Sequence, residues 1–275
     1  MNSAPLFSAV ILSFNSERYI EHCVTSLLTA FAGFAQASEI LIFDNGSRDN
    51  SRTLIATLVK RHPDTVKALY ADTNLGTTVS RNRAIAMARG AFILILDSDA
   101  TIDSAALAIL KSALEADSSI GMAVPQLRYP DGRFQLSADQ FPTVTRKIQR
   151  FFTLKSMEQS ARPQDAPREV DYAISACWLL PRAVVERVGP LDEHIFYSPE
   201  DVDYCVRVWQ AGYRIVYLPQ AIAIHDAQEL SRRAKFFRFT LSHAGGLVYL
   251  FRKHHYAFTR RALVRRFPRP PAPGH

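Results

Sequence analysis

Short apolar segments alternate with segments of helical period through the first 125 residues, and this alternation constrains the fold more than any other feature. The apolar segments are expected to be strands, and they cover residues 9–14, 39–43, 66–70, 91–96 and 121–124. The helical segments between them cover residues 17–31, 49–59, 78–88 and 104–115. Strands that are apolar on both faces and joined by helices predict a mainly parallel sheet with helices on both sides. The expected fold class is therefore α/β.

The pattern changes after Pro125. A turn signal at residues 129–132 predicts a hairpin between residues 126–128 and 133–136. Residues 140–168 are polar and contain three prolines, so we expect a mobile or acceptor-facing segment. Order is expected to return at residues 170–180 and to continue through two helices to strands at 214–217 and 221–225.

Composition places the chain among folded proteins with one large core. Its 275 residues are 48% hydrophobic and 21% charged, which excludes global disorder. The three cysteines (Cys23, Cys177 and Cys205) are far apart and without paired spacing, so we expect buried thiols rather than disulfides or a zinc site. No apolar run approaches the roughly 20 residues of a membrane span, and no signal peptide is recognisable. We therefore expect a cytoplasmic protein.

Positive charge is concentrated at the C-terminal end. Of the 33 Lys and Arg residues, 11 lie within residues 231–275, which contain no acidic residue, so the other 22 face 26 acidic residues in the body. Aromatic and aliphatic residues lie among these basic residues, as in a helix that rests on an anionic membrane surface. Packing of the same apolar residues on the body explains the pattern equally well. The expected segments are a basic helical one at 229–267 and a disordered tail at 268–275.

Polar clusters follow three of the predicted strands. They are Ser13 to Glu17, Asp44 to Ser47, and Asp97-Ser98-Asp99. A parallel sheet places all three at one edge, where ligands bind in such folds. Asp44 can accept hydrogen bonds from a ribose or a base, whereas turn formation and helix capping are the structural alternative. Three clusters at one edge favour a nucleotide site.

The triplet Asp97-Ser98-Asp99 is a candidate metal site. Two carboxylates separated by one residue can hold Mg²⁺ or Mn²⁺ against a diphosphate. The alternative is that Asp99 or Asp103 caps the helix that begins near Ser104. The triplet alone does not decide between these roles.

Three further residues have two interpretations each. Ser198-Pro199-Glu200-Asp201 is typical of a helix start, with Ser198 as cap, but a carboxylate there can also act as a general base. His225 ends a strand and is either a packed residue or a ligand. Arg81 lies either on a solvated helix face or against a donor diphosphate.

Taken together, these residues resemble the family-2 inverting glycosyltransferases, especially the bacterial rhamnosyltransferase-like branch. The resemblance runs in the family's order over residues 8–226, about four-fifths of the chain. It rests on the stretches 9–15, 42–47, 74–76, 93–99, 188–193, 199–203 and 211–214, the last leading to His225. It implies a nucleotide-diphospho-sugar transferase (GT-A type) fold over residues 1–228, with a nucleotide-sugar half at 1–125 and an acceptor half at 126–228.

The resemblance also implies a role for each matching position. Donor-binding residues are Ser13, Asn15, Glu17, Asp44, Asn45, Arg81, Asp97 and Ser98. Asp99 and His225 match metal ligands, and Asp201 matches the catalytic base. Trp178, Asp192 and Glu200 are expected on the acceptor side. The expected partners are a UDP- or dTDP-linked sugar and a glycan or lipid-linked acceptor, at or near the inner membrane leaflet, with no nucleic acid.

Two departures and two rival functions remain. Ser175-Ala176-Cys177-Trp178 stands where relatives commonly have a glycine-alanine pair, which predicts a remodelled floor on the acceptor side. Residues 77–82 follow the general family form, so the donor sugar stays open. A nucleotidyltransferase would need a Gly-rich basic loop after the first strand, which residues 13–17 do not provide. A nucleic-acid-binding module would explain the basic end but not the carboxylates at the sheet edge.

Overall fold

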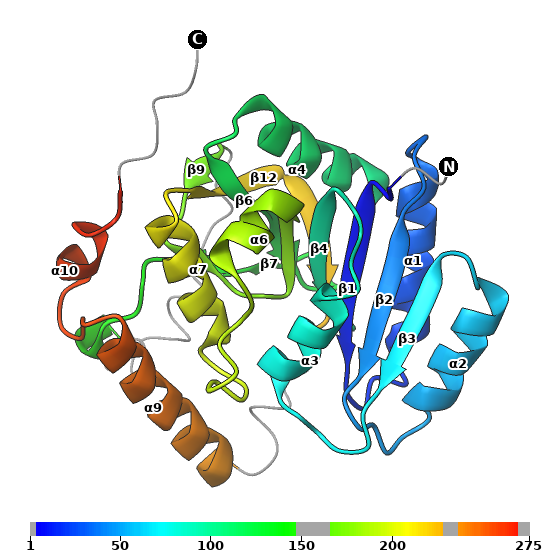
Figure 1. The fold of residues 1–275 in the computed structure, drawn as a ribbon, viewed down its shortest axis with the longest axis horizontal. Coiled ribbons are helices and arrows are strands. Elements are labelled where there is room, and N and C mark those ends of the chain that lie inside the picture. Colours follow the sequence, from blue (N-terminus) through cyan, green and yellow to red (C-terminus); the bar gives the residue numbers. More distant parts are fainter. Residues whose placement is uncertain (1–3, 147–165, 228–235, 269–275) are drawn as a thin grey trace.

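A ten-stranded sheet forms the centre of the computed structural model, which describes residues 4–146, 166–227 and 236–268 (Figure 1). Four parallel strands make one side of the sheet: β1 (Phe7–Ser13), β2 (Glu39–Asp44), β3 (Val66–Tyr70) and β4 (Phe92–Asp97). The order across the sheet is β3-β2-β1-β4, followed by β11, β6, β12 and β5. The parallel α/β class is therefore confirmed.

The second half of the sheet is mixed. Strand β11 (Cys177–Pro181) runs antiparallel between β4 and β6 (Ile120–Arg128). Strand β12 (Arg214–His225) is parallel to β6, and β5 (Ala100–Ile102) pairs with its end. Two short strands extend this sheet, because β7 (Phe134–Gln135) pairs with β6 and β9 (Arg168–Glu169) pairs with β12. Strands β8 (Ala138–Asp139) and β10 (Tyr172–Ala173) form a separate two-stranded sheet. The reversed strand β11 brings the loop before it, residues 174–176, to the edge where β4 ends.

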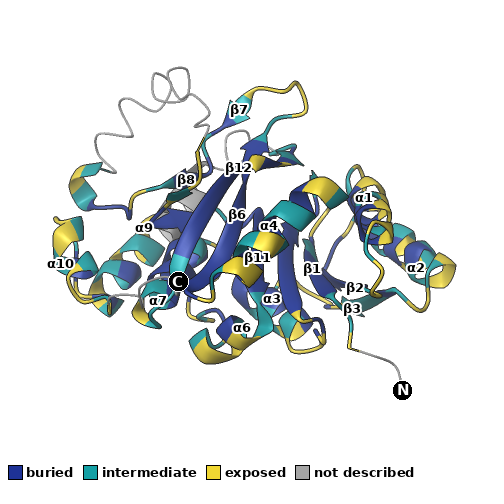
Figure 2. Cartoon of the chain, turned by 90° about the horizontal axis from the view of Figure 1, so that it is seen from above, coloured by how far each residue is buried: buried dark blue, intermediate teal, exposed yellow. Residues whose placement is uncertain are grey.

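Helices cover both faces of the sheet because the strands are apolar on both faces. On one face, α1 (Ile20–Ala32), α2 (Ser51–Arg61) and α4 (Ser104–Ala116) pack with Ala9 and Ile11 of β1. On the other face, Val10 joins the core under α3 (Thr77–Ile85), α6 (Arg182–Val188) and α7 (Glu200–Gln210). Figure 2 shows the strands buried between helices whose outer sides are exposed.

The register of the parallel strands brings the polar clusters together, as the sequence predicts. Ser13 lies opposite Asp44, and Leu12 lies opposite Asp97, so β1, β2 and β4 end at one edge. The hairpin after β6 is also confirmed, because Leu127 and Arg128 pair with β7. The expected strands at 214–217 and 221–225 form one strand, β12, whose register shifts between Leu218 and Ile222.

The C-terminal segment contains α9 (Phe236–Lys253) and α10 (Arg260–Val264). Leu250 and Leu263 are fully buried in the core of the body, and the Phe267 ring stacks on Trp209 with centroids 5.9 Å apart. Packing on the body therefore accounts for these apolar residues. Side chains of residues 236–243 lie outside the described part, so the membrane prediction for Phe236, Phe237, Phe239 and Leu241 is not addressed there. Among the described residues, no helix is long and apolar enough to cross a membrane.

Two sequence expectations fall largely on undescribed residues. Of the segment 140–168, residues 147–165 lie outside the described part. At its described beginning, Phe141 is 1% exposed and its backbone N–H donates to Asp171, so this residue is packed. Of the tail expected at 268–275, only Pro268 is described.

Candidate active site

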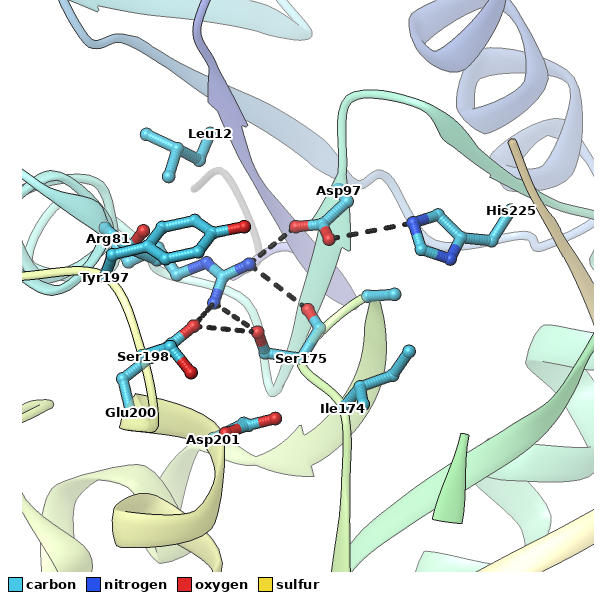
Figure 3. A pocket seen from close by; sticks show the side chains of 12 residues that line it. Leu12, Arg81, Asp97, Ile174, Ser175, Tyr197, Ser198, Glu200, Asp201 and His225 are labelled. Atoms are coloured by element: carbon cyan, nitrogen blue, oxygen red, sulfur yellow. Dashed lines mark hydrogen bonds and ion pairs between the residues drawn. The ribbon is translucent and has the colours of Figure 1, made fainter. Parts of the chain in front are cut away.

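A cavity of about 250 Å³ opens beyond the ends of β1 and β4 (Figure 3). Its sheet side is formed by Leu12, Asp97 and His225. The opposite side comes from the start of α7 and the loop before it, namely Tyr197, Ser198, Glu200 and Asp201. Thr77 and Arg81 of α3 and the loop before β11 complete the lining. The cavity thus lies between the sheet edge and the start of α7.

Arg81 connects the elements around this cavity. Its side chain is 3% exposed, and Nη2 lies 2.6 Å from Asp97 Oδ1. Nη1 donates to Ser175 Oγ at 2.6 Å and lies 3.4 Å from Glu200 Oε1 (Figure 3). The solvated-face interpretation of Arg81 is therefore wrong, because this face of α3 points into the protein.

Asn45 holds the loop from which α3 starts. Its Oδ1 accepts the Leu75 N–H at 2.7 Å, and its Nδ2 donates to Asn74 Oδ1 at 2.9 Å. Gly76, at φ 88°, then leads into α3, and a Cβ there would come 2.5 Å from the Phe196 carbonyl oxygen. Both ends of the Asn45 amide therefore contact the loop before α3, and they fix the start of the helix that carries Arg81.

Asp97, Asp99 and His225 form a candidate metal centre. One ligand atom from each lies within 4.8 Å of the others, and His225 Nε2 is 3.3 Å from Asp99 Oδ1 and 4.0 Å from Asp97 Oδ2. Asp103, rather than Asp99, caps helix α4, because its carboxylate accepts the Ala106 N–H at 2.7 Å. Two carboxylates and one imidazole suit a divalent cation such as Mn²⁺ or Mg²⁺. The donor set therefore fits the expected metal.

Gln135 orients the histidine of this group and is a residue that sequence reasoning missed. Its Oε1 lies 2.9 Å from His225 Nδ1, so Nδ1 carries the proton and Nε2 faces the two aspartates. Gln135 is buried on β7, which the hairpin after β6 pairs with β6, the strand that also pairs with β12. The hairpin signal predicts β7, but no local pattern assigns Gln135 to His225.

The charges of this group shift two pKa values. Burial alone would lower the pKa of His225, but the hydrogen bond to Asp99 and the nearby aspartate charges outweigh it and raise the pKa. Burial raises the pKa of Asp97, with Arg81 opposing it and Asp99 reinforcing it. The two aspartates repel each other, and a bound cation would relieve this repulsion.

Glu200 and Asp201 begin helix α7 at the opposite wall. The cap assigned to Ser198 is wrong: Pro199 is the cap residue, no side chain caps the helix, and Ser198 lines the cavity. Burial and then the charge of Asp201 raise the pKa of Glu200 to about 8, against the opposing charge of Arg81. Adjacent carboxylates in different surroundings are typical of sites that divide acid and base roles.

Turn formation explains only part of the environment of Asp44. Its side chain is fully buried, Oδ1 accepts the Ser47 N–H at 3.2 Å, and Arg52 Nε lies 3.3 Å from the same oxygen. Within the described residues, Oδ2 has no hydrogen-bond partner, and neither has the buried Ser13 Oγ. Turn formation therefore accounts for one carboxylate oxygen only, and buried polar atoms without partners are typical of ligand sites.

The other donor-side residues are engaged within the edge loops. Asn15 Oδ1 accepts the Arg48 N–H at 2.9 Å, and Glu17 Oε2 accepts the Asn50 N–H at 3.0 Å. Ser98 Oγ lies 2.7 Å from Ser16 Oγ. These contacts bring the three clusters side by side, as expected.

Two of the acceptor-side residues lie away from the cavity. Trp178 is 1% exposed and stacks on Tyr204 in the core, with ring centroids 5.9 Å apart. The Asp192 carboxylate accepts from Tyr249 Oη and Lys253 Nζ of α9. Only Glu200 of the three lines the cavity, whereas Tyr197 and Ser175 line it without having been assigned.

Comparisons with known proteins agree with this geometry. The family described as glycosyl transferase family 2 matches residues 8–189. An N-acetylglucosaminyl-diphospho-decaprenol L-rhamnosyltransferase of Mycobacterium tuberculosis is 26% identical over 266 residues, covering 89% of this chain and 84% of the relative. The similarity to this relative thus extends over most of both chains.

Two solved structures show the fold. TarS 1–349 of S. aureus with UDP-GlcNAc gives a TM-score of 0.63 at 18% identity, covering 94% of this chain and 70% of TarS 1–349. A mannosyltransferase of Pyrobaculum calidifontis with GDP-Man and Mn²⁺ gives a TM-score of 0.62 at 16% identity. The match covers 95% of this chain and 68% of the mannosyltransferase. The fold is therefore of the GT-A type that the resemblance implies.

Replacing Gln135 with Ala should weaken binding of Mn²⁺, because the His225 ring would lose the partner that turns Nε2 toward the aspartates. We expect affinity to fall roughly 10- to 100-fold, as for other lost partners of metal-bound histidine. Calorimetric titration of Mn²⁺ with UDP present would measure this. Gln220→Ala, at an exposed position of β12, is the control. Equal affinities in the two variants would contradict the role given to Gln135.

Glu200 should make stability depend on pH. Its folded pKa of about 8 lies above the ordinary value of 4.5, so its contribution is complete below about pH 4.5 and is lost as pH rises through 8. From pH 5.5 to 8.5 the wild type should lose about 3 kcal/mol more than Glu200→Gln. Urea unfolding at both pH values tests this, and equal losses would count against a neutral Glu200.

Proposed function

We propose that this chain, which belongs to glycosyl transferase family 2, transfers a sugar from a nucleotide diphosphate to an acceptor hydroxyl with inversion at the anomeric carbon. The chain is a glycosyltransferase of GT-A fold. One observation carries the finer proposal: the cavity has Asp97 and His225, two of the three candidate metal ligands, on one wall and Asp201 on the other. A donor held at the first wall would present its anomeric carbon to an acceptor activated at the second.

The donor base is proposed to bind at Asp44. The Oδ2 atom without a partner can accept a hydrogen bond from a ring N–H, and the Ser13 hydroxyl beside it can bind a carbonyl or ribose oxygen. Uracil and thymine both carry such an N–H, which favours a UDP- or dTDP-linked sugar. Asn15, Glu17, Asn45 and Ser98 would keep the edge loops in place around the nucleotide.

The diphosphate is proposed to lie against Asp97, Asp99 and His225. A divalent cation, Mn²⁺ or Mg²⁺, would neutralise the charge that builds up on the departing nucleoside diphosphate. The support is the donor set itself and the orientation of His225 by Gln135. Arg81 adds a fixed positive charge beside Asp97.

Asp201 is proposed as the general base. It takes the proton of the acceptor hydroxyl while the oxygen bonds to the anomeric carbon and the bond from that carbon to the phosphate oxygen breaks. Its position on the cavity wall supports this role. The neighbouring Glu200, with its raised pKa, is a neutral residue that shapes the acceptor side and holds Arg81.

The acceptor is proposed to be a glycan or lipid-linked glycan of the cell envelope. The support is the Mycobacterium tuberculosis relative, whose name gives a diphospho-decaprenol-linked acceptor and L-rhamnose as the transferred sugar. Tyr197, 48% exposed at the cavity, offers a ring face for a sugar. Because Trp178 and Asp192 do not line the cavity, any effect of theirs on the acceptor would be indirect.

Asp201→Asn should abolish transfer and leave nucleotide binding intact, because the amide keeps the shape of the side chain but cannot take a proton. Loss by a factor of roughly 100 to 10,000 is expected for a general base. The assay is release of nucleoside diphosphate from UDP-GlcNAc, GDP-mannose and dTDP-rhamnose with Mn²⁺, alongside calorimetric titration of UDP and dTDP. Asp64→Asn, at an exposed position, is the control.

The outcomes of this assay separate the competing functions. Full turnover in Asp201→Asn would refute the base assignment. Pyrophosphate release from a nucleoside triphosphate and a sugar phosphate would instead identify a nucleotidyltransferase. Salt-sensitive binding of RNA, with no nucleotide-sugar turnover, would indicate a nucleic-acid-binding module.

A basic surface near the C-terminal end is proposed to contact anionic membrane lipid. Phe258 is 74% exposed and Val248 is 58% exposed, and exposed Arg252 and Arg261 lie near them in the chain. An exposed aromatic beside arginines suits the interface of a bilayer with anionic head groups. Such contact would bring the cavity to a lipid-linked acceptor.

Charge reversal of Arg252 and Arg261 to Glu should weaken binding to anionic vesicles by at least about tenfold, since each basic residue contributes about 1 kcal/mol at such a surface. Co-sedimentation with phosphatidylglycerol-containing vesicles measures this, with pure phosphatidylcholine for comparison. Reversal of Arg61 and Arg187, exposed elsewhere, is the matched control. Equal binding by both double variants would exclude this surface.

A further inference from the structure

Helix α9 packs directly on the turn that leads into α7. Figures 1 and 2 show the two helices beside one another at one end of the molecule. The turn, Ser198-Pro199, precedes Glu200 and Asp201, so its position sets where both carboxylates enter the cavity. Residue 189 is the last that the family match covers, and both α9 and α7 follow it.

The closest contact between them is at Gly246. A Cβ on Gly246 would lie 2.3 Å from the Ser198 carbonyl oxygen and 2.8 Å from Pro199 Cδ. Real Cβ atoms do not approach backbone atoms this closely, so any side chain would push the turn away. Gly245, one residue earlier in α9, has no atom within 4 Å of the equivalent point. Only one glycine of the pair therefore serves a close approach.

A buried polar cluster fixes the same helix pair further along. Asp203 of α7 is 1% exposed, and its Oδ1 lies 2.8 Å from His254 Nε2 and 2.7 Å from Lys253 Nζ. Its Oδ2 accepts from Arg207 Nε at 3.0 Å. A carboxylate this deeply buried is stable only when its charge is matched, and two of its partners come from the C-terminal end of α9 and the residue after it.

Lys253 extends the cluster to the loop before the turn. Its Nζ lies 2.5 Å from Asp192 Oδ2, and Tyr249 Oη donates to the same oxygen at 2.8 Å. Burial would raise the pKa of Asp192 and of Asp203, but the hydrogen bonds from Lys253 and its neighbours outweigh burial and lower both. One lysine thus joins the segments on both sides of Ser198.

We infer that α9 positions the general base: Gly246, Lys253 and His254 hold the Ser198–Pro199 turn and the first turn of α7 so that Asp201 faces the cavity. The inference rests on the proposed function for the base role of Asp201. Gly246, Lys253 and His254 are positioning residues, since they line no part of the cavity. A helix of the basic C-terminal segment therefore holds the acceptor side in place. Catalysis would then depend on how α9 is oriented on the body.

Gly246→Ala and Gly245→Ala form a matched pair for the test. Each replaces a helical glycine with alanine and should raise the helix propensity of α9 equally. Only the Gly246 variant places a methyl group against Ser198. The full chain is assayed for hydrogen exchange of the segment around 198–205, nucleoside diphosphate release from the three donors, binding of UDP with Mn²⁺, and thermal midpoint.

The expected result is a selective defect. In Gly246→Ala, kcat should fall at least about tenfold and exchange at the start of α7 should rise, because small displacements of a catalytic group are costly. Affinity for UDP with Mn²⁺ and KM for the donor should stay as in Gly245→Ala. Lys253→Met, which keeps the length of the side chain but not its charge, should show the same pattern and replaces Gly246→Ala if that variant does not fold.

Two results would overturn the inference. One is equal kcat and equal exchange in the two glycine variants. The other is a loss of UDP binding and thermal midpoint in parallel with kcat, which would mean that α9 only stabilises the fold. If the wild type releases nucleoside diphosphate from none of the donors, the proposed function fails instead, and the exchange comparison still decides whether α9 holds the turn.

Discussion

The buried guanidinium of Arg81 is the contact on which the rest of the site depends. A charge that is 3% exposed must be matched by a nearby partner, which for Arg81 is Asp97 at the end of β4. Glu200 at the start of α7, whose pKa is raised, lies 3.4 Å from the same guanidinium. Ser175 completes the set from the loop before β11. These elements are far apart in the chain, so this one side chain fixes the distance between the metal-binding wall and the wall that carries Asp201.

The two walls owe their rigidity to different forces. On the sheet side, backbone hydrogen bonds of parallel strands set the register that aligns Ser13 with Asp44 and Leu12 with Asp97. On the side of α7, contacts with α9 hold the wall in place. These contacts are the ion pairs of Asp203 and the close packing of Gly246 against the Ser198–Pro199 turn. One wall is therefore held by backbone pairing between strands, and the other by side-chain packing between helices.

The strands and the sheet edge were predictable because their signals are local. Apolar runs such as β3 were placed at the observed residues, and the clusters that follow β1, β2 and β4 meet where a parallel sheet requires. Partners brought together by long-range packing were not predictable. The exposure of Arg81, the Gln135 contact to His225 and the attachment of Asp192 to α9 each depend on segments more than 50 residues apart. A sequence pattern does not show which of such distant segments come into contact in the folded chain.

The neighbouring carboxylates of α7 show how position separates function. Glu200 is buried beside Arg81, and its raised pKa makes the neutral form the stable one near pH 7. A second negative charge beside Asp201 is thereby avoided, and the Arg81 charge is left mainly to Asp97. The neutral Glu200 thus leaves the Arg81 charge beside Asp97, while the proposed mechanism gives the base role to Asp201.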